Sequence, residues 1–215
     1  MTLSHTPSPQ DDAATGRAAG GFLLAMSVLI VFTMGHHPTG HDGGAVMAGL
    51  SLSALVHSAM TAFWAINLWA FVIYMRRRGA GGLTLAGFIA YALSGIGHLL
   101  AALISGAITP GLAARIDVAA SHDLFVLTWS MNQSYAAFGV YFTGAAYVLW
   151  GLALIWKATG LNRMLGALGV VLGVLPALAL LAGWVSLNVH GAFLIYGGHS
   201  LFAAIVGIQM LRGRL

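Results

Sequence analysis

The sequence predicts an all-α membrane protein, a polytopic bundle of six transmembrane helices with both termini on the cytoplasmic side. The first reason is composition: 59% of the 215 residues are hydrophobic and only 7% are charged. A soluble domain has about 25% charged residues, so this chain has too few charged residues to cover a water-facing surface. The second reason is that the apolar residues form long runs separated by short loops. The third is that the basic residues gather at alternate ends of these runs.

The clearest span is the apolar run at residues 45–75, which ends at Arg76, Arg77 and Arg78. A helix needs about 20 apolar residues to cross a bilayer, and this run exceeds that length. Loops on the cytoplasmic side carry an excess of Lys and Arg. The three arginines therefore place this end of the helix in the cytoplasm.

The rest of the chain is interpreted in the same way. We expect residues 1–17 to be a disordered cytoplasmic tail and 18–215 to be a single transmembrane domain. The expected helices are residues 18–35, 45–75, 83–107, 124–156, 164–186 and 191–211. Pro110 and Gly111 should open the loop after the third helix, and Pro176 should kink the fifth. Residues 18–34 follow Arg17 as in a signal peptide, but no small-x-small cleavage site follows, so we expect an uncleaved first helix.

An even number of spans puts both termini on one side of the membrane. Eight basic residues fall on that side: Arg17, Arg76, Arg77, Arg78, Lys157, Arg163, Arg212 and Arg214. Only Arg115 falls on the other side. The positive-inside rule then predicts a multi-pass protein of the inner (cytoplasmic) membrane with cytoplasmic termini. Since these residues act as topological anchors, the high pI does not indicate a nucleic-acid partner.

The residue types that are missing exclude several chemistries. The chain has no cysteine, which excludes disulfides, thiolate metal ligands and thiol catalysis. It has no glutamate, which argues against a carboxylate-driven pump or a di-iron carboxylate centre. Nine histidines against five acidic residues is the one unusual feature of the composition.

The histidines lie mostly on the non-cytoplasmic side. At 1.5 Å per residue, His57, His98 and His199 lie about 25, 22 and 18 Å from the cytoplasmic ends of their helices, in a hydrocarbon core about 30 Å thick. Five more fall in outer loops: His36, His37, His41, His122 and His190. Ionisable residues inside a membrane are candidates for function. Alternatively, each neutral imidazole only hydrogen-bonds a neighbouring helix and holds the bundle together.

A haem is one use of the three intramembrane histidines. A single b-type haem between two of His57, His98 and His199 would need small residues beside the porphyrin. The segments 94–98 and 197–199, Ser-Gly-Ile-Gly-His and Gly-Gly-His, supply them. A quinol could then be oxidised near Asn132, Gln133 or His122, which predicts quinol-linked electron transfer in the outer half of the bilayer.

A bare transition metal is the second use. Candidate ligands are His36, His37, His41, Asp42, His122 and Asp123. Imidazole and carboxylate in this pattern suit Cu(II), Ni(II) or Zn(II). A nickel, copper or zinc permease would capture the ion on the first outer loop and pass it to the three histidines below.

The same loop resembles a known family motif. Residues 37–42, His-Pro-Thr-Gly-His-Asp, are similar to the His-Pro-x-x-Gly-x-Asp-His motif of the hydrogenase-linked nickel/cobalt permeases. One residue is missing between Pro38 and Gly40, and Gly43 stands where the last histidine should be. The similarity covers only this loop and the start of the second helix, and it implies transition-metal transport.

The remaining reading is a non-catalytic accessory subunit. Such a protein would pack its apolar faces on the helices of partner membrane subunits or of a second copy, with the lipid bilayer around it. The sequence leaves open whether the protein is an enzyme.

Overall fold

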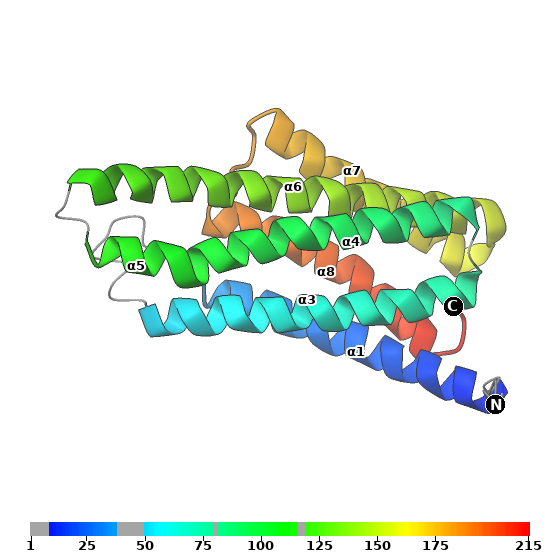
Figure 1. Cartoon of the computed structure of the whole chain (residues 1–215). Helices are drawn as coiled ribbons and strands as arrows, with labels where there is room; N and C mark the ends of the chain where they lie inside the picture. The colour runs from blue at the N-terminus through cyan, green and yellow to red at the C-terminus, as the bar shows by residue number, and fades with distance from the viewer. Residues whose placement is uncertain (1–8, 38–49, 80, 116–118) are drawn as a thin grey trace, which may run out of the picture.

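The computed structural model describes residues 9–37, 50–79, 81–115 and 119–215, and all of their regular structure is helical (Figure 1). The elements are α1 (Pro9–Gly35), α3 (Leu50–Arg78), α4 (Gly82–Leu103), the π-helical turn η1 (Ile104–Ile108), α5 (Thr109–Ala113), α6 (Ala119–Lys157), α7 (Gly160–Leu181) and α8 (Val189–Leu211). Within the described residues, six helices are long and apolar enough to cross a membrane. The prediction of an all-α chain with six such helices is confirmed.

The first helix begins earlier than expected. Helix α1 starts at Pro9, so the prediction that the tail is disordered as far as residue 17 is wrong from residue 9 onwards. Proline suits the first position of a helix, and Asp11 and Asp12 in the first turn complement the helix dipole. Arg77 Nη1 also donates a hydrogen bond to the Asp12 carbonyl at 3.0 Å, which attaches this extension to α3. Residues 1–8 lie outside the described part of the chain.

The third span also differs from its expected bounds. It does not stop at residue 107, because α4, η1 and α5 follow one another and the apolar segment runs from Gly82 to Leu112. Pro110, expected to open a loop, lies instead in the first turn of α5. Because proline has no N–H, it removes one backbone hydrogen bond at the junction of η1 and α5. The π-helical turn just before it changes the direction in which the following side chains leave the helix. Such turns are frequent at functional sites.

The last two helices meet at a short connection. Helix α7 passes through Pro176 and ends at Leu181, five residues before the expected end at 186. Gly183 adopts a φ of 69°, its N–H bonds the Leu180 carbonyl, and the Trp184 N–H bonds the Ala179 carbonyl. This is the glycine-based Schellman ending of a helix. Helix α8 then begins with Asn188 as its cap, whose Oδ1 accepts from the Gly191 N–H at 2.9 Å.

Glycines bring neighbouring helices into backbone contact. A Cβ on Gly20 of α1 would lie 2.6 Å from the carbonyl oxygen of Gly207 on α8. Gly144 of α6 and Gly173 of α7 approach each other in the same way. Helices in membranes associate through small residues of this kind, since apolar burial alone gives them little driving force. The pairs α1 with α8 and α6 with α7 are therefore held by close packing.

The end of α3, the start of α7 and the C-terminus lie at one end of the bundle, here called the basic end (Figure 1). Arg77 Nε donates to the Leu215 carbonyl at 3.0 Å, and Asn162 Nδ2 donates to the Arg214 carbonyl at 3.2 Å. The end of α3, the α6–α7 connection and the C-terminus thus lie together. The start of α1 joins them through the bond to Asp12.

A core of stacked aromatic rings lies between the basic end and the middle of the bundle. We call Trp64, Phe71, Tyr91, Tyr147 and Trp150 the aromatic cluster. The rings of Phe71 and Trp150 stack with centroids 4.5 Å apart, and those of Trp64 and Tyr91 stack at 5.1 Å. Phe71 and Trp150 are 0% exposed. The Trp150 indole N–H donates to the carbonyl of Thr84 at 3.0 Å, so this buried indole has a hydrogen-bond acceptor.

Candidate functional site

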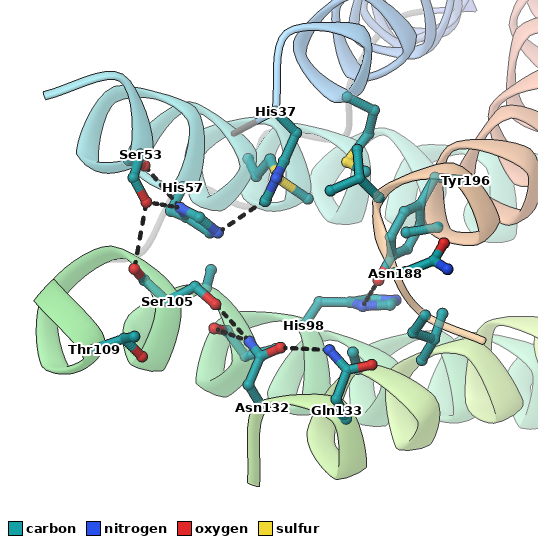
Figure 2. Close-up of a pocket in the computed structure, with 18 of the residues that line it drawn as sticks. His37, Ser53, His57, His98, Ser105, Thr109, Asn132, Gln133, Asn188 and Tyr196 are labelled. Carbon is teal, nitrogen blue, oxygen red and sulfur yellow. Dashed lines mark hydrogen bonds between the residues drawn. The ribbon is translucent and has the colours of Figure 1, made fainter. Parts of the chain in front are cut away.

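Two cavities lie on the far side of the aromatic cluster from the basic end. The larger, the His57 cavity, has a volume of about 130 Å³ and lies between α3, α4–η1–α5, α6 and the start of α8 (Figure 2). Its polar lining consists of His37, Ser53, His57, His98, Ser105, Thr109, Asn132, Gln133, Asn188 and Tyr196. The smaller, the His199 cavity, has a volume of about 70 Å³.

His57 is held in one orientation by its own helix. Its Nδ1 lies 2.7 Å from the carbonyl oxygen of Ser53, one turn earlier on α3. A carbonyl can only accept, so Nδ1 carries the proton and Nε2 presents a lone pair. His57 is 7% exposed. Its lone pair therefore has a fixed direction inside the bundle.

That lone pair faces a second imidazole. The Nε2 atoms of His37 and His57 lie 3.3 Å apart, and the two rings meet edge to face with centroids 5.0 Å apart (Figure 2). Two nitrogens bound to one tetrahedral zinc ion at 2.0–2.1 Å are separated by about 3.3 Å. An N–H···N hydrogen bond has a similar length. The distance between the two nitrogens thus fits either a hydrogen bond between the rings or a metal ion bound to both.

A polar network lines the opposite wall of the His57 cavity. Asn132 Nδ2 donates to the Ala101 carbonyl at 2.8 Å and to Ser105 Oγ at 2.7 Å. Gln133 Nε2 donates to Asn132 Oδ1 at 3.1 Å. Ser53 Oγ donates to the Ser105 carbonyl at 3.4 Å. Asn132 and Gln133, expected near a quinol, therefore lie in the same cavity as His57.

His98 forms part of the partition between the two cavities. It lines both of them, as do Met60, Ala102 and Tyr196. Its Nε2 lies 3.3 Å from Thr143 Oγ1, and its Nδ1 lies 3.3 Å from the Tyr196 hydroxyl. Both ring nitrogens thus have hydroxyl partners, one from α6 and one from α8.

His199 lies in the smaller cavity and is 5% exposed. Its ring packs edge to face on Tyr147, with centroids 5.3 Å apart, and the Tyr147 hydroxyl donates to the His199 carbonyl at 3.1 Å. Among the residues that the structure describes, none hydrogen-bonds His199 Nε2.

His57, His98 and His199 do not meet at one point. His57 lines one cavity, His199 the other, and His98 lies between them. Within the described ranges, no three His, Cys, Asp or Glu side chains form a group that could hold a metal. Instead the structure pairs His57 with His37. The structure therefore does not bring His57, His98 and His199 together as one set of three metal ligands. A haem between two of them stays a prediction.

The small residues near His98 have a different role from the one expected. A Cβ on Gly95 would overlap the indole of Trp64, and a Cβ on Gly97 would lie 2.6 Å from the Tyr135 carbonyl oxygen. Because these glycines have no side chain, there is space for the Trp64 indole, and α6 can approach α4 closely. They therefore give no support for a porphyrin beside His98.

The other predicted metal ligands lie apart from both cavities or outside the described residues. His36 is exposed and its Nδ1 lies 2.8 Å from the Phe32 carbonyl oxygen. His122 and Asp123 are exposed in the first turns of α6 and line neither cavity. His41 and Asp42 belong to residues 38–49, outside the described part, as does the permease-like motif from Pro38 onwards.

Sequence reasoning missed Ser53, Ser105, Thr109 and Tyr196 as cavity residues. Ser53 could have been found, because it precedes His57 by one helical turn. The others could not, since their place depends on the π-helical turn and on how α8 packs against α4.

Comparison with known proteins adds no assignment. No protein-family model matches the chain, and no curated protein and no solved structure is significantly similar to it. The fold and the cavities define a class of protein. It is a helical bundle whose six long helices could cross a membrane and whose interior cavities are lined by histidines and other polar residues.

Proposed function

We propose that the chain is a multi-pass protein of the cytoplasmic membrane, with the basic end and both termini in the cytoplasm. Six helices of spanning length and the gathering of Arg and Lys at one end support this topology. Large apolar side chains on the outside of the bundle suit contact with lipid. Examples are Leu181, 72% exposed, and Leu194, 68% exposed.

Within that protein, the His57 cavity binds a divalent transition-metal ion from the non-cytoplasmic side. The observation that carries this proposal is the His37–His57 pair, with Nε2 atoms 3.3 Å apart and the Nδ1 of His57 committed to a backbone carbonyl. Histidine ligands of metals almost always donate their other ring N–H in this way, which fixes the tautomer and orients the lone pair.

The remaining ligands would be oxygen atoms. Ser53, Asn132 and Gln133 line the same cavity, and His37 directly precedes the segment with His41 and Asp42. Imidazole with oxygen suits Zn(II), Ni(II) or Cu(II).

Metal binding can be measured on the purified protein by equilibrium dialysis against each ion, followed by elemental analysis. His57→Asn should weaken metal binding by at least about 100-fold. Replacing a residue that only hydrogen-bonds a metal ligand already lowers metal affinity by about 10–100-fold. His190→Asn is the matched control, since His190 is exposed near the start of α8 and lines neither cavity. Equal affinity in His57→Asn and the unaltered protein would refute the proposal.

An absorption spectrum of the same sample tests the haem alternative. A Soret band that disappears on replacing His98 or His199 would assign a b-type haem and quinol-linked electron transfer instead. A spectrum without it, in a protein that binds no metal and co-purifies with larger subunits, would favour an accessory role.

A permease is the second candidate. The observation that favours it is the His199 cavity, which continues the polar interior beyond the His57 cavity. Cells that express the protein should then accumulate the bound ion, and His57→Asn should abolish the accumulation while His190→Asn preserves it.

A further inference from the structure

Two residues that line the His199 cavity each carry a buried polar atom that no described residue hydrogen-bonds. Asn67 on α3 and His199 on α8 both line it and are 4% and 5% exposed. Asn67 Oδ1 and His199 Nε2 have no hydrogen-bond partner among the described residues. Buried polar groups in proteins are nearly always hydrogen-bonded, either to protein or to ordered water, because an unpaired one is costly.

The cavity is large and polar enough for water. A water molecule needs about 10–15 Å³ of such volume and two to four polar partners. The cavity offers about 70 Å³. Besides Asn67 and His199, hydroxyl groups of Thr143 and Ser200 line it.

The His199 cavity has different neighbours in the two directions along the bundle. Met60, His98, Ala102 and Tyr196 line both cavities, so the His57 cavity adjoins it directly. In the opposite direction Trp64, Tyr91 and Tyr147 form its floor, and Phe71 and Trp150, both 0% exposed, pack beneath them. The aromatic cluster therefore closes the cavity towards the basic end.

We propose that the His199 cavity is a hydrated binding site, in which water or a neutral solute of that size hydrogen-bonds Asn67 Oδ1 and His199 Nε2. Its ligand enters from the His57 cavity, past His98 and Tyr196, because the aromatic cluster closes the side towards the basic end. This site does not depend on the metal proposed for His37 and His57, and it holds whether or not that metal binds.

Because the chain has no cysteine, single cysteines can report on the cavity without background. Ser200 lines the His199 cavity and is 6% exposed, whereas Ser94 is 0% exposed and lines neither cavity. Ser200→Cys and Ser94→Cys are thus matched, nearly isosteric replacements that differ in contact with the cavity. Thr159→Cys, exposed between α6 and α7, marks the basic end.

The full-length variants are placed in sealed vesicles and treated with 2-aminoethyl methanethiosulfonate on each face in turn, with free cysteine on the opposite face to consume reagent that crosses the bilayer. The reagent needs a thiolate, and a thiol in dry apolar surroundings stays protonated, so Ser200→Cys should react at least about 10-fold faster than Ser94→Cys. The reaction should occur only from the face opposite the one that labels Thr159→Cys.

Equally slow reaction of Ser200→Cys and Ser94→Cys would overturn the proposal, as would labelling of Ser200→Cys from the basic end. A second matched pair guards against a local effect at position 200. Ala203 lines the cavity and is 3% exposed, and Ala146 is 0% exposed and lines neither cavity. Ala203→Cys should behave as Ser200→Cys does, and Ala146→Cys as Ser94→Cys does.

Discussion

At the scale of single residues, the site depends on how each ring or amide is oriented. His57 keeps its Nδ1 on the Ser53 carbonyl, and His98 has hydroxyl groups on both nitrogens. The sequence was enough to single out His57 and His98 as polar residues deep in apolar helices. It could not pair His57 with His37, because that contact depends on where the chain turns after α1.

Asn132 tests the polar wall of the His57 cavity. Asn132→Leu leaves the Ala101 carbonyl and Ser105 Oγ without their donor, so the free energy of unfolding should fall by about 1–3 kcal/mol. Thermal denaturation in detergent measures this. Ser134→Ala, at an exposed site two residues further along α6, should change it by no more than about 0.5 kcal/mol. Equal effects from the two would show that the network contributes nothing.

At the scale of elements, hydropathy predicts where a helix lies better than where it ends. All six apolar runs became helices, because only a helix satisfies the backbone of such a run in lipid. Two of the errors fall at prolines, and a third falls at the early end of α7, where Gly183 adopts a positive φ. Pro9 opens α1 and Pro110 lies within the first turn of α5, and neither role is visible until the neighbouring turns are known.

Glycine substitutions separate packing from helix propensity. Gly95→Ala in α4 would push a methyl group into the Trp64 indole, so it should destabilise the protein by about 1–3 kcal/mol. Gly197→Ala in α8 meets no atom within 4 Å, so it should leave stability unchanged or raise it by up to about 1 kcal/mol. Thermal denaturation of both variants checks the pair. A stabilising Gly95→Ala would contradict the packing described for α3 and α4.

At the scale of the whole molecule, polarity is divided between the two ends. Basic residues and both described chain ends lie at one end, whereas the histidine-lined cavities lie beyond the aromatic cluster (Figure 1). The positions of Lys and Arg along the sequence predicted that the basic residues gather at one end. The division of the histidines between two cavities was not predictable, since it depends on how five helices pack.

The topology predicts where reporters will be active. Green fluorescent protein fused after residue 215, or inserted after Thr159, should fluoresce, because both positions lie at the basic end. Alkaline phosphatase should be inactive at those two positions and active at residues 183–187, between α7 and α8. The reverse pattern would mean that the positive-inside rule fails for this chain.

The central claim is that His37 and His57 hold one metal ion between them. X-ray absorption spectroscopy of the zinc-loaded protein at the zinc edge tests it most directly. At least two imidazole nitrogens should appear at about 2.0–2.1 Å, with one fewer in His57→Asn and no change in His190→Asn. A zinc ion without imidazole ligands, or with the same number in His57→Asn, would contradict the account.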